Sequence, residues 1–320
     1  MSADTQATSA DAVGETPRRG SPGRAGDRIF SAAATTAGVT ILVLLAGVAI
    51  FLLIEAWPAI NAPAEELPGG EGLVAYIAPL AFGTVVAASI AIVLAVPMAV
   101  AVSLFITFFA PARVSQSLGY VVDLLAAVPS IIYGLWGIAV LGPAAVGIQQ
   151  WLAENVGFLP FFEGPASSTG RTMLIAGLVL GVMILPIITA VTREVFSQTP
   201  RTHREGALAL GATRSEMIRM TVLPFGRSAI ISGSMLGLGR ALGETMAVTI
   251  ILSVSGAVTF NLISSGNPST IAANIALDFP ESSGLAVNAL IASGLVLFAI
   301  TLVVNMAARA VITRTEAAAR

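Results

Sequence analysis

The chain contains neither cysteine nor lysine, and it has a single histidine, His203. Without cysteine it can form no disulfide and carry out no thiol redox chemistry. Without lysine it lacks the phosphate-binding lysine of a P-loop, so it cannot hydrolyse ATP by that route. One histidine is too few for a paired-histidine zinc motif. We therefore expect no enzymatic activity, no catalytic residue, no metal site and no cofactor.

Charge is also scarce along the 320 residues. Charged residues make up 11% of the chain and hydrophobic residues 56%, whereas soluble domains are roughly 25% charged. The formal net charge is −2, so there is no general positive field that would attract nucleic acid. This composition predicts an integral membrane protein.

Six apolar stretches are long enough to cross a bilayer, which takes about 20 residues of helix. They predict an all-α, polytopic membrane domain over residues 29–312, with a disordered tail over 1–28 and a second tail over 313–320. We expect Pro97 to bend the second helix, and Pro129 and Pro186 to interrupt the third and fourth. The predicted spans are residues 31–55, 79–110, 118–141, 173–195, 228–254 and 285–310.

Arginine alternates from one side of the predicted spans to the other. Four arginines precede the first span, six lie within residues 193–227 and three follow residue 308, whereas the alternate loops are acidic apart from Arg171. Because basic residues favour the cytoplasmic side, both termini are predicted to be cytoplasmic, in the plasma membrane of a bacterium. A cleaved signal peptide is the competing interpretation of the first span, but its apolar run exceeds a signal core of about 7–15 residues.

The segment 196–227 between the fourth and fifth spans carries signals for two short helices. Thr202 with Glu205, and Thr213 with Glu216, have the spacing of a capping box, in which each side chain satisfies a backbone amide at a helix start. Gly211 is expected to end the first helix, and Leu223–Pro224 to end the second. The pattern alone equally fits an amphipathic loop on the membrane surface.

The same segment resembles the EAA loop of ABC importer permeases, although Gly206 and Thr221 depart from the family pattern. The resemblance implies that this loop docks into a groove on an ATPase subunit and transmits its movement to the membrane helices. We refer to residues 196–227 as the predicted coupling loop. The positions expected to couple to the ATPase are Glu205, Gly206, Ala207, Gly211, Leu223 and Pro224.

Two charges lie in the fifth predicted span, Arg240 and Glu244, on one helix face with Gly233 and Gly237. An arginine at the bilayer centre costs about 2.5–3.5 kcal/mol on insertion scales. A neutralising ion pair, four residues apart and locked into the helix packing, is one interpretation. The other is that Arg240 offers a cationic, bidentate site to a tetrahedral oxyanion, while Glu244 holds it in place.

Residues 240–248 resemble the signature of phosphate-specific transport permeases, and with residues 124–137 they are similar to the PstC-type subunit. The resemblance covers about residues 75–312. It implies a type I ABC importer permease fold and an inorganic phosphate importer. It also implies a homologous PstA-type permease, a PstB-type ATPase dimer and a PstS-type extracytoplasmic binding protein. Permeases for sulfate or molybdate, an ATPase-independent carrier and a membrane scaffold are the rival interpretations.

Four hydroxyl residues could add donors along the anion pathway. Ser130 and Tyr133 flank the expected break at Pro129, where the backbone should be irregular. Thr84 and Thr245 lie in or beside other spans. For each hydroxyl the alternative is a bond to a carbonyl of its own helix. Asp123 is expected to be an interfacial charge.

Overall fold

A computed structural model describes residues 23–252 and 258–318, with side chains over 26–252 and 258–310. The described residues form helices and connecting segments without a β-strand, which confirms the predicted all-α class. The chain divides into two compact units, residues 1–50 and 51–320, and α1 crosses that boundary. The α-helices are α1 Gly23–Asn61, α2 Leu73–Leu104, α3 Ala112–Ala126, α4 Ser130–Trp136, α5 Gly142–Val156, α6 Met173–Ser197, α7 Arg201–Ala209, α8 Arg214–Met217, α9 Leu223–Leu242, α10 Met246–Ile251, α11 Ile271–Asp278 and α12 Leu285–Ala318.

Short helical segments of other types join several of these helices. Three are π-helical, Phe105–Phe109, Gly137–Leu141 and Ile218–Val222, and each continues an α-helix without a break. Two are 3₁₀ turns, Ala64–Glu66 and Phe279–Glu281. π segments are rare and often lie at functional positions. Contacts of Phe108 and Gly137, which lie in the first and second of them, are described below.

Five described helical segments are long and apolar enough to cross a membrane: Gly26–Asn61, Leu73–Phe109, Ser130–Val156, Met173–Ser197 and Leu285–Ala310. They confirm the predicted polytopic organisation. α1 begins at Gly23, inside the predicted tail over residues 1–28, and α12 continues to Ala318, through most of the tail predicted over 313–320. Residues 1–22 of the predicted disordered tail lie outside the described residues.

The third predicted span is not one helix. α3 ends at Ala126 and α4 begins at Ser130, because Pro129 has no N–H to donate and disfavours helical geometry at the residue before it. The helix then continues into α5, which extends beyond residue 141, the predicted end of the third span. Pro186, by contrast, lies inside an unbroken α6, so the predicted interruption there is wrong.

The fifth predicted span is also broken. α9 ends at Leu242, the chain leaves the helix over Gly243–Thr245, and α10 resumes at Met246. Residues 253 and 254 of this predicted span lie outside the described residues. The break separates Arg240 from Glu244, so the two residues do not face one another across one helical turn.

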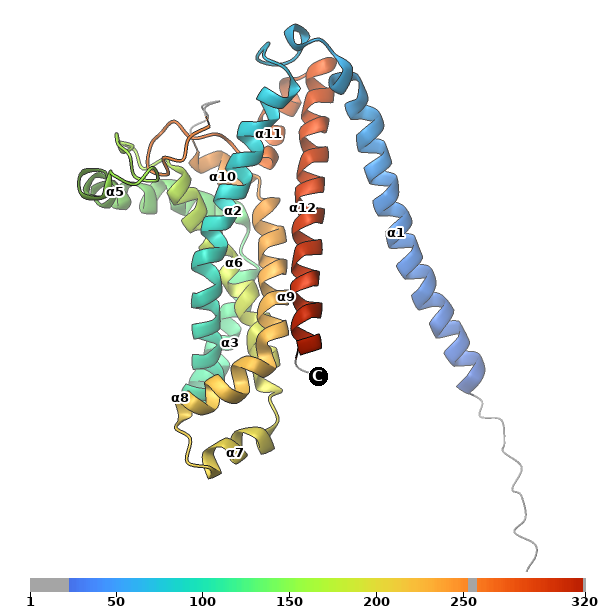
Figure 1. The fold of residues 1–320 in the computed structure, drawn as a ribbon, viewed down its shortest axis with the longest axis vertical. Helices are drawn as coiled ribbons and strands as arrows, with labels where there is room; N and C mark the ends of the chain where they lie inside the picture. The colour runs from blue at the N-terminus through green and yellow to red at the C-terminus, as the bar shows by residue number, and fades with distance from the viewer. Residues whose placement is uncertain (1–22, 253–257, 319–320) are drawn as a thin grey trace, which may run out of the picture. The chain divides into compact units, whose positions relative to one another are not determined.

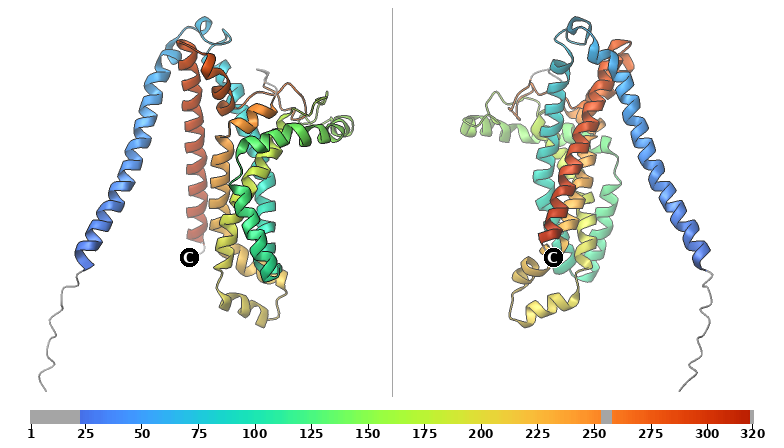
Figure 2. Two further views of the ribbon diagram at one scale, coloured as in Figure 1. Left: turned by 180° about the vertical axis from the view of Figure 1, so that it is seen from behind. Right: turned by 45° about the vertical axis from the view of Figure 1, so that its right-hand side comes forward.

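The core of the second unit lies where α2, α6 and α9 run side by side (Figures 1 and 2). The alanines of α2 at positions 87, 91, 95 and 99 recur every four residues and are fully buried among the apolar residues of α6. Gly233 and Gly237 of α9 lie against Ile188 of α6. Small residues permit this close approach of helices, so the predicted glycine face is a packing face.

The loop that joins α7 and α8 is held by two local hydrogen-bonding motifs. Gly211 has a φ of +88°, its N–H donates to the carbonyl of Leu208, and Ala212 donates to that of Ala207. This is a Schellman motif, and it confirms that Gly211 ends the first helix. Together, α7 and α8 lie at the end of the second unit where α6 ends (Figure 1).

The second motif confirms one predicted capping box and the structure corrects the other. The amide of Glu216 donates to Thr213 Oγ1 at 3.3 Å, and Glu216 Oε2 accepts from the amide of Thr213 at 2.8 Å. Thr202 forms no such box, because α7 already begins at Arg201. Pro224 does not end the second helix either, since it falls in the first turn of α9, where a missing N–H is tolerated.

We expect Gly134→Ala to destabilise the protein by about 1–3 kcal/mol through overpacking. A Cβ atom at Gly134 would lie 2.8 Å from the Cα of Ala247, a backbone atom that cannot move aside alone. Thermal unfolding of the purified protein should show a lower midpoint. The control is Gly147→Ala in α5, where a Cβ meets nothing within 4 Å. Equal midpoints for the two variants would contradict the close contact of α4 with α10.

The hydrogen bonds from Thr213 lower the pKa of the Glu216 carboxyl. A carboxyl whose pKa is lower in the folded state stabilises that state above its unfolded pKa of about 4.3, and the effect is lost as pH falls through the folded pKa. We therefore expect hydrogen-exchange protection of the first turn of α8 to fall below about pH 4. Glu216→Gln should remove this pH dependence, and a pH-independent protection in the unaltered protein would contradict the capping box.

Candidate functional site

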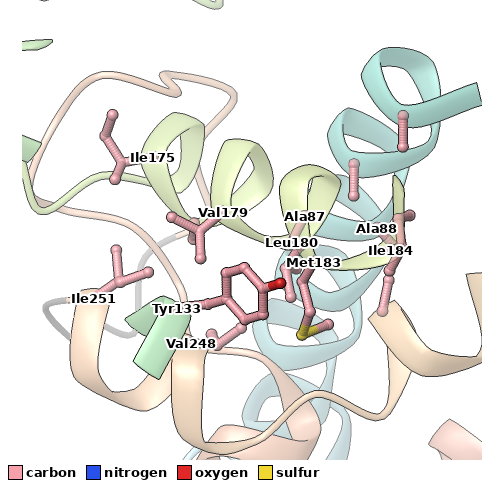
Figure 3. Packing of buried hydrophobic residues seen from close by; sticks show 14 of the residues in the cluster. Ala87, Ala88, Tyr133, Ile175, Val179, Leu180, Met183, Ile184, Val248 and Ile251 are labelled. Carbon is pink, nitrogen blue, oxygen red and sulfur yellow. The ribbon is translucent and has the colours of Figure 1, made fainter. Parts of the chain in front are cut away.

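Two of the helix breaks meet inside the second unit. α4 and α10 each follow a break, and they pack against one another through Gly134 and Ala247. Gly137, the first residue of the π segment that follows α4, lies against Ile251 of α10. Figure 3 shows the ring of Tyr133 close to Val248 of α10 and to the apolar residues of α6. The structure thus brings together two segments that were singled out separately in the sequence, residues 124–137 and 240–248.

Tyr133 closes the first break. Its hydroxyl donates to the carbonyl of Leu125 at 2.9 Å. In a continuous helix that carbonyl would accept from the residue four positions on, which here is Pro129 and has no N–H. The hydroxyl proton of Tyr133 is therefore engaged in a hydrogen bond within the protein. This geometry argues against the predicted donation to an anion. The side chain of Ser130, at the start of α4, makes no hydrogen bond to any described residue.

Glu244 holds the second break. Its side chain is buried, with 8% of the residue exposed, and its Oε1 accepts from the amide of Ala247 at 3.1 Å. A carboxylate is favoured at this place by the partial positive charge of the first helical turn. The predicted ion pair with Arg240 is wrong, because that pair requires a helix that continues past Leu242. Thr245 Oγ1 donates to the carbonyl of Gly243 at 3.3 Å and closes the turn.

Arg240 lines a cavity between α9 and α12. Its side chain is half-buried. The cavity has a volume of about 590 Å³, and two arginines but no carboxylate are among the described residues that line it. The lining residues are Ser232, Met235, Leu236, Gly239, Arg240, Asn305, Ala308 and Arg309. Among the described residues, no carboxylate of the lining compensates the charge of Arg240 in this cavity.

Thr84 does not line this cavity, and its hydroxyl forms hydrogen bonds within the protein. It is buried, its hydroxyl donates to the carbonyl of Leu80 at 2.7 Å, and its oxygen accepts from the amide of Ile271 at 2.9 Å. The second bond fixes the start of α11 against α2. This geometry argues against the predicted contact between Thr84 and an anion.

Arg171 has a role that the sequence analysis missed. Its Nε donates to the carbonyl of Ile251, and its Nη2 to those of Ile250 and Leu252, each at 3.3 Å. These carbonyls end α10, where a positive charge is favoured. The available signal was that Arg171 is the basic exception in an otherwise acidic set of loops.

A second interaction that was missed joins α6 to α3. Arg193 and Asp123 form an ion pair at 3.5 Å, the one ion pair found within the part of the chain that the structure describes. Asp123 was expected to be an interfacial charge, and no partner for it was predicted. Its partner is 70 residues away in the sequence, so helix spacing alone gave no signal for the pair.

The positions of the predicted coupling loop divide between an open face and a packed face. Glu205 and Gly206 of α7 are exposed, and a Cβ at Gly206 would meet nothing within 4 Å. Ala207 and Leu223 instead pack against a buried cluster that includes Phe196 and Val222. The loop is thus anchored to the bundle on one side and accessible on the other.

Arg204 connects α7 to the π-helical end of α2. Its guanidinium lies over the ring of Phe108, 5.6 Å from the centroid, a favourable cation–π arrangement. Both side chains line a cavity of about 430 Å³ under α7. This contact gives α7 a second attachment to the transmembrane helices, besides its covalent connection to α6.

Comparison with known proteins supports a transport fold. Residues 99–317 match the family described as binding-protein-dependent transport system inner membrane component. The fold resembles a bacterial ABC transporter involved in the import of the acidic polysaccharide alginate, with a TM-score of 0.57 and 15% identity over 90% of this chain and 96% of that one. The same transporter in complex with an alginate pentasaccharide-bound periplasmic protein gives a TM-score of 0.58 at 15% identity, over 88% and 93%.

Curated relatives cover most of the chain. Phosphate transport system permease protein PstC 2 of Mycobacterium tuberculosis is 47% identical over 302 residues, which is 91% of this chain and 93% of that protein. The PstC of Mycobacterium leprae is 46% identical, over 89% and 92%, and that of Haemophilus influenzae 38%, over 91% and 94%. The chain therefore belongs to the binding-protein-dependent transport system inner membrane component family, as a multi-pass membrane protein similar to PstC-type phosphate permeases.

Proposed function

We propose that this chain is the permease subunit of an ATP-driven importer of inorganic phosphate, and that it forms the translocation pathway with a homologous permease. The observation that carries the proposal is the guanidinium of Arg240, which lines a cavity with no described carboxylate. The PstC-type relatives support phosphate as the anion.

Arg240 would bind the anion directly. A guanidinium offers two parallel N–H donors that fit two oxygens of a tetrahedral oxyanion. Its position in a span is costly without a counter-charge, and a passing anion supplies one. Two hydroxyl residues remain candidate contacts in our proposal. They are Ser130, the first residue of α4, and Thr245, which directly precedes α10.

Glu244 would act indirectly in this proposal. By capping α10 it fixes the break that follows Arg240, and its negative charge lowers the net positive charge of the region. Conduction requires that the ion be bound weakly enough to leave. A site with Arg240 alone would hold a phosphate dianion more tightly than one with a buried carboxylate in the same segment.

The partners follow from the family and from the loop. A PstB-type ATPase dimer would dock on the exposed face of α7 around Glu205 and Gly206, and a PstA-type permease would complete the pathway. A PstS-type binding protein would deliver phosphate from outside the cell, in keeping with the family's dependence on binding proteins. The arginine distribution supports cytoplasmic termini and a bacterial plasma membrane.

We expect Arg240→Gln to lower phosphate uptake about 100-fold or more, since removing one partner of a desolvated charge contact typically costs 2–5 kcal/mol. The measurement is uptake of radiolabelled phosphate by the complete transporter in proteoliposomes, with assembly checked by co-purification. Arg113→Gln, at an exposed position in the first turn of α3 and outside the cavity, is the matched control. Normal uptake by the Arg240 variant would contradict the proposed anion site. Inhibition by sulfate equal to that by unlabelled phosphate would show that the site is not specific for phosphate.

We expect Gly211→Val to uncouple ATP hydrolysis from uptake. A β-branched residue is strained at a φ of +88°, so the α7–α8 bend must change and α7 must move on its ATPase. The measurement is the number of ATP molecules hydrolysed per phosphate imported, which should rise severalfold. Gly69→Val is the control, because Gly69 has a similar φ of +84° in a different loop. An unchanged ratio for Gly211→Val would count against the coupling assignment.

A further inference from the structure

We propose that Arg193 and Asp123 are positioning residues for transport, whose ion pair transmits movement of the predicted coupling loop to the Arg240 site. The proposal rests on the proposed function in one respect, namely that an ATPase acts on residues 196–227. It concerns how that action reaches the two helix breaks, the second of which follows Arg240 in the chain.

Arg193 lies where the bundle meets the loop. It is in the last turns of α6, which ends at Ser197, and α7 begins at Arg201. Its Nη2 is 3.5 Å from both Oδ1 and Oδ2 of Asp123. A displacement of α7 along or across the bundle therefore acts first on the segment of α6 that carries Arg193.

The surface of α3 is shaped to receive the Arg193 side chain. A Cβ atom at Gly119 would lie 2.2 Å from Nη1 of Arg193. Gly119 is one helical turn before Asp123 and thus on the same face of α3. The guanidinium therefore lies directly against the backbone of α3 and contacts its carboxylate one turn further on.

From Asp123 a continuous set of contacts leads to the proposed anion site. Asp123 is one turn before the end of α3, and the carbonyl of Leu125 accepts from the Tyr133 hydroxyl across the break. Tyr133 packs against Val248 of α10, and α10 begins at the turn that Glu244 caps. A shift of α3 relative to α6 must therefore move α4 and α10, which lie on the far sides of the two breaks.

Stability alone does not account for this ion pair. The side chains are 25% and 55% exposed for Arg193 and Asp123, and pairs this exposed contribute little to the folded state. A weak pair can open and re-form in each cycle, which a tightly buried one cannot do easily. A cavity of about 430 Å³ adjoins the pair and gives the arginine room to move, and its polar lining includes Thr107, Ser115 and Gln116.

The absence of cysteine from the chain permits a direct structural test. Ser117→Cys in α3 and Leu135→Cys in α4, both at exposed positions, place two spin labels across the break. In the complete transporter we expect the distance between the labels to change when ATP is trapped. The change should be lost in Asp123→Asn and in Arg193→Gln, and kept in the conservative Asp123→Glu. It should return to at least half in the exchange Asp123→Arg with Arg193→Asp.

Transport by the same variants provides the second readout. Asp123→Asn and Arg193→Gln should each import at least fivefold less phosphate per ATP, with ATP hydrolysis within twofold of the unaltered transporter. The control is Glu194→Gln, because Glu194 lines the same cavity but lies outside the pair. Its ratio should not change.

Three results would overturn the proposal. They are no ATP-dependent distance change in the unaltered transporter, a full change in Asp123→Asn or Arg193→Gln, or a folded exchange variant that lacks the change as those two variants do. Failure of the phosphate proposal is distinguishable, because the label distance does not depend on which anion is carried. In that case the unaltered transporter would import no phosphate but would still show the distance change.

Discussion

Backbone groups that are released where a helix breaks inside the bundle must find polar partners, and this constraint organises the rest of the structure. In a hydrocarbon environment each unpaired group costs several kcal/mol. Tyr133 donates to the carbonyl of Leu125, which also accepts from the amide of Val128, Glu244 accepts from the first turn of α10, and Arg171 donates to the carbonyls at its end. Three polar side chains in or beside the spans are thus committed to the fold.

The same constraint explains why Arg240 is suited to a ligand. In a continuous fifth helix Glu244 would lie beside Arg240 and neutralise it. Because the chain breaks after Leu242, the carboxylate turns to the amide of Ala247 instead, and Arg240 lines a cavity without a described acidic side chain. The helix break is therefore what converts a structural ion pair into a candidate anion site.

Features with a local cause could be predicted from the sequence, and features with a distant cause could not. The apolar spans, the glycine that ends α7 and the capping box at Thr213 depend on residues within one or two turns. The break at 243–245 escaped prediction because apolar residues continue on both sides of it. The bonds of Arg171 and the Arg193–Asp123 pair join positions 70 or more residues apart, so neither periodicity nor spacing could reveal them. The wrong Arg240–Glu244 pair nevertheless drew attention to the segment that contains the second helix break.

The claim that the Arg240 cavity is an anion pathway is tested most directly by its accessibility. Gly239→Cys would introduce a single thiol beside Arg240 in a chain that has no other cysteine, and a Cβ there meets nothing within 4 Å. A negatively charged, membrane-impermeant thiol reagent should modify this cysteine in the complete transporter, and phosphate should slow the reaction whereas chloride should not. A thiol that stays unmodified in every nucleotide state, or a rate that phosphate does not change, would contradict the account.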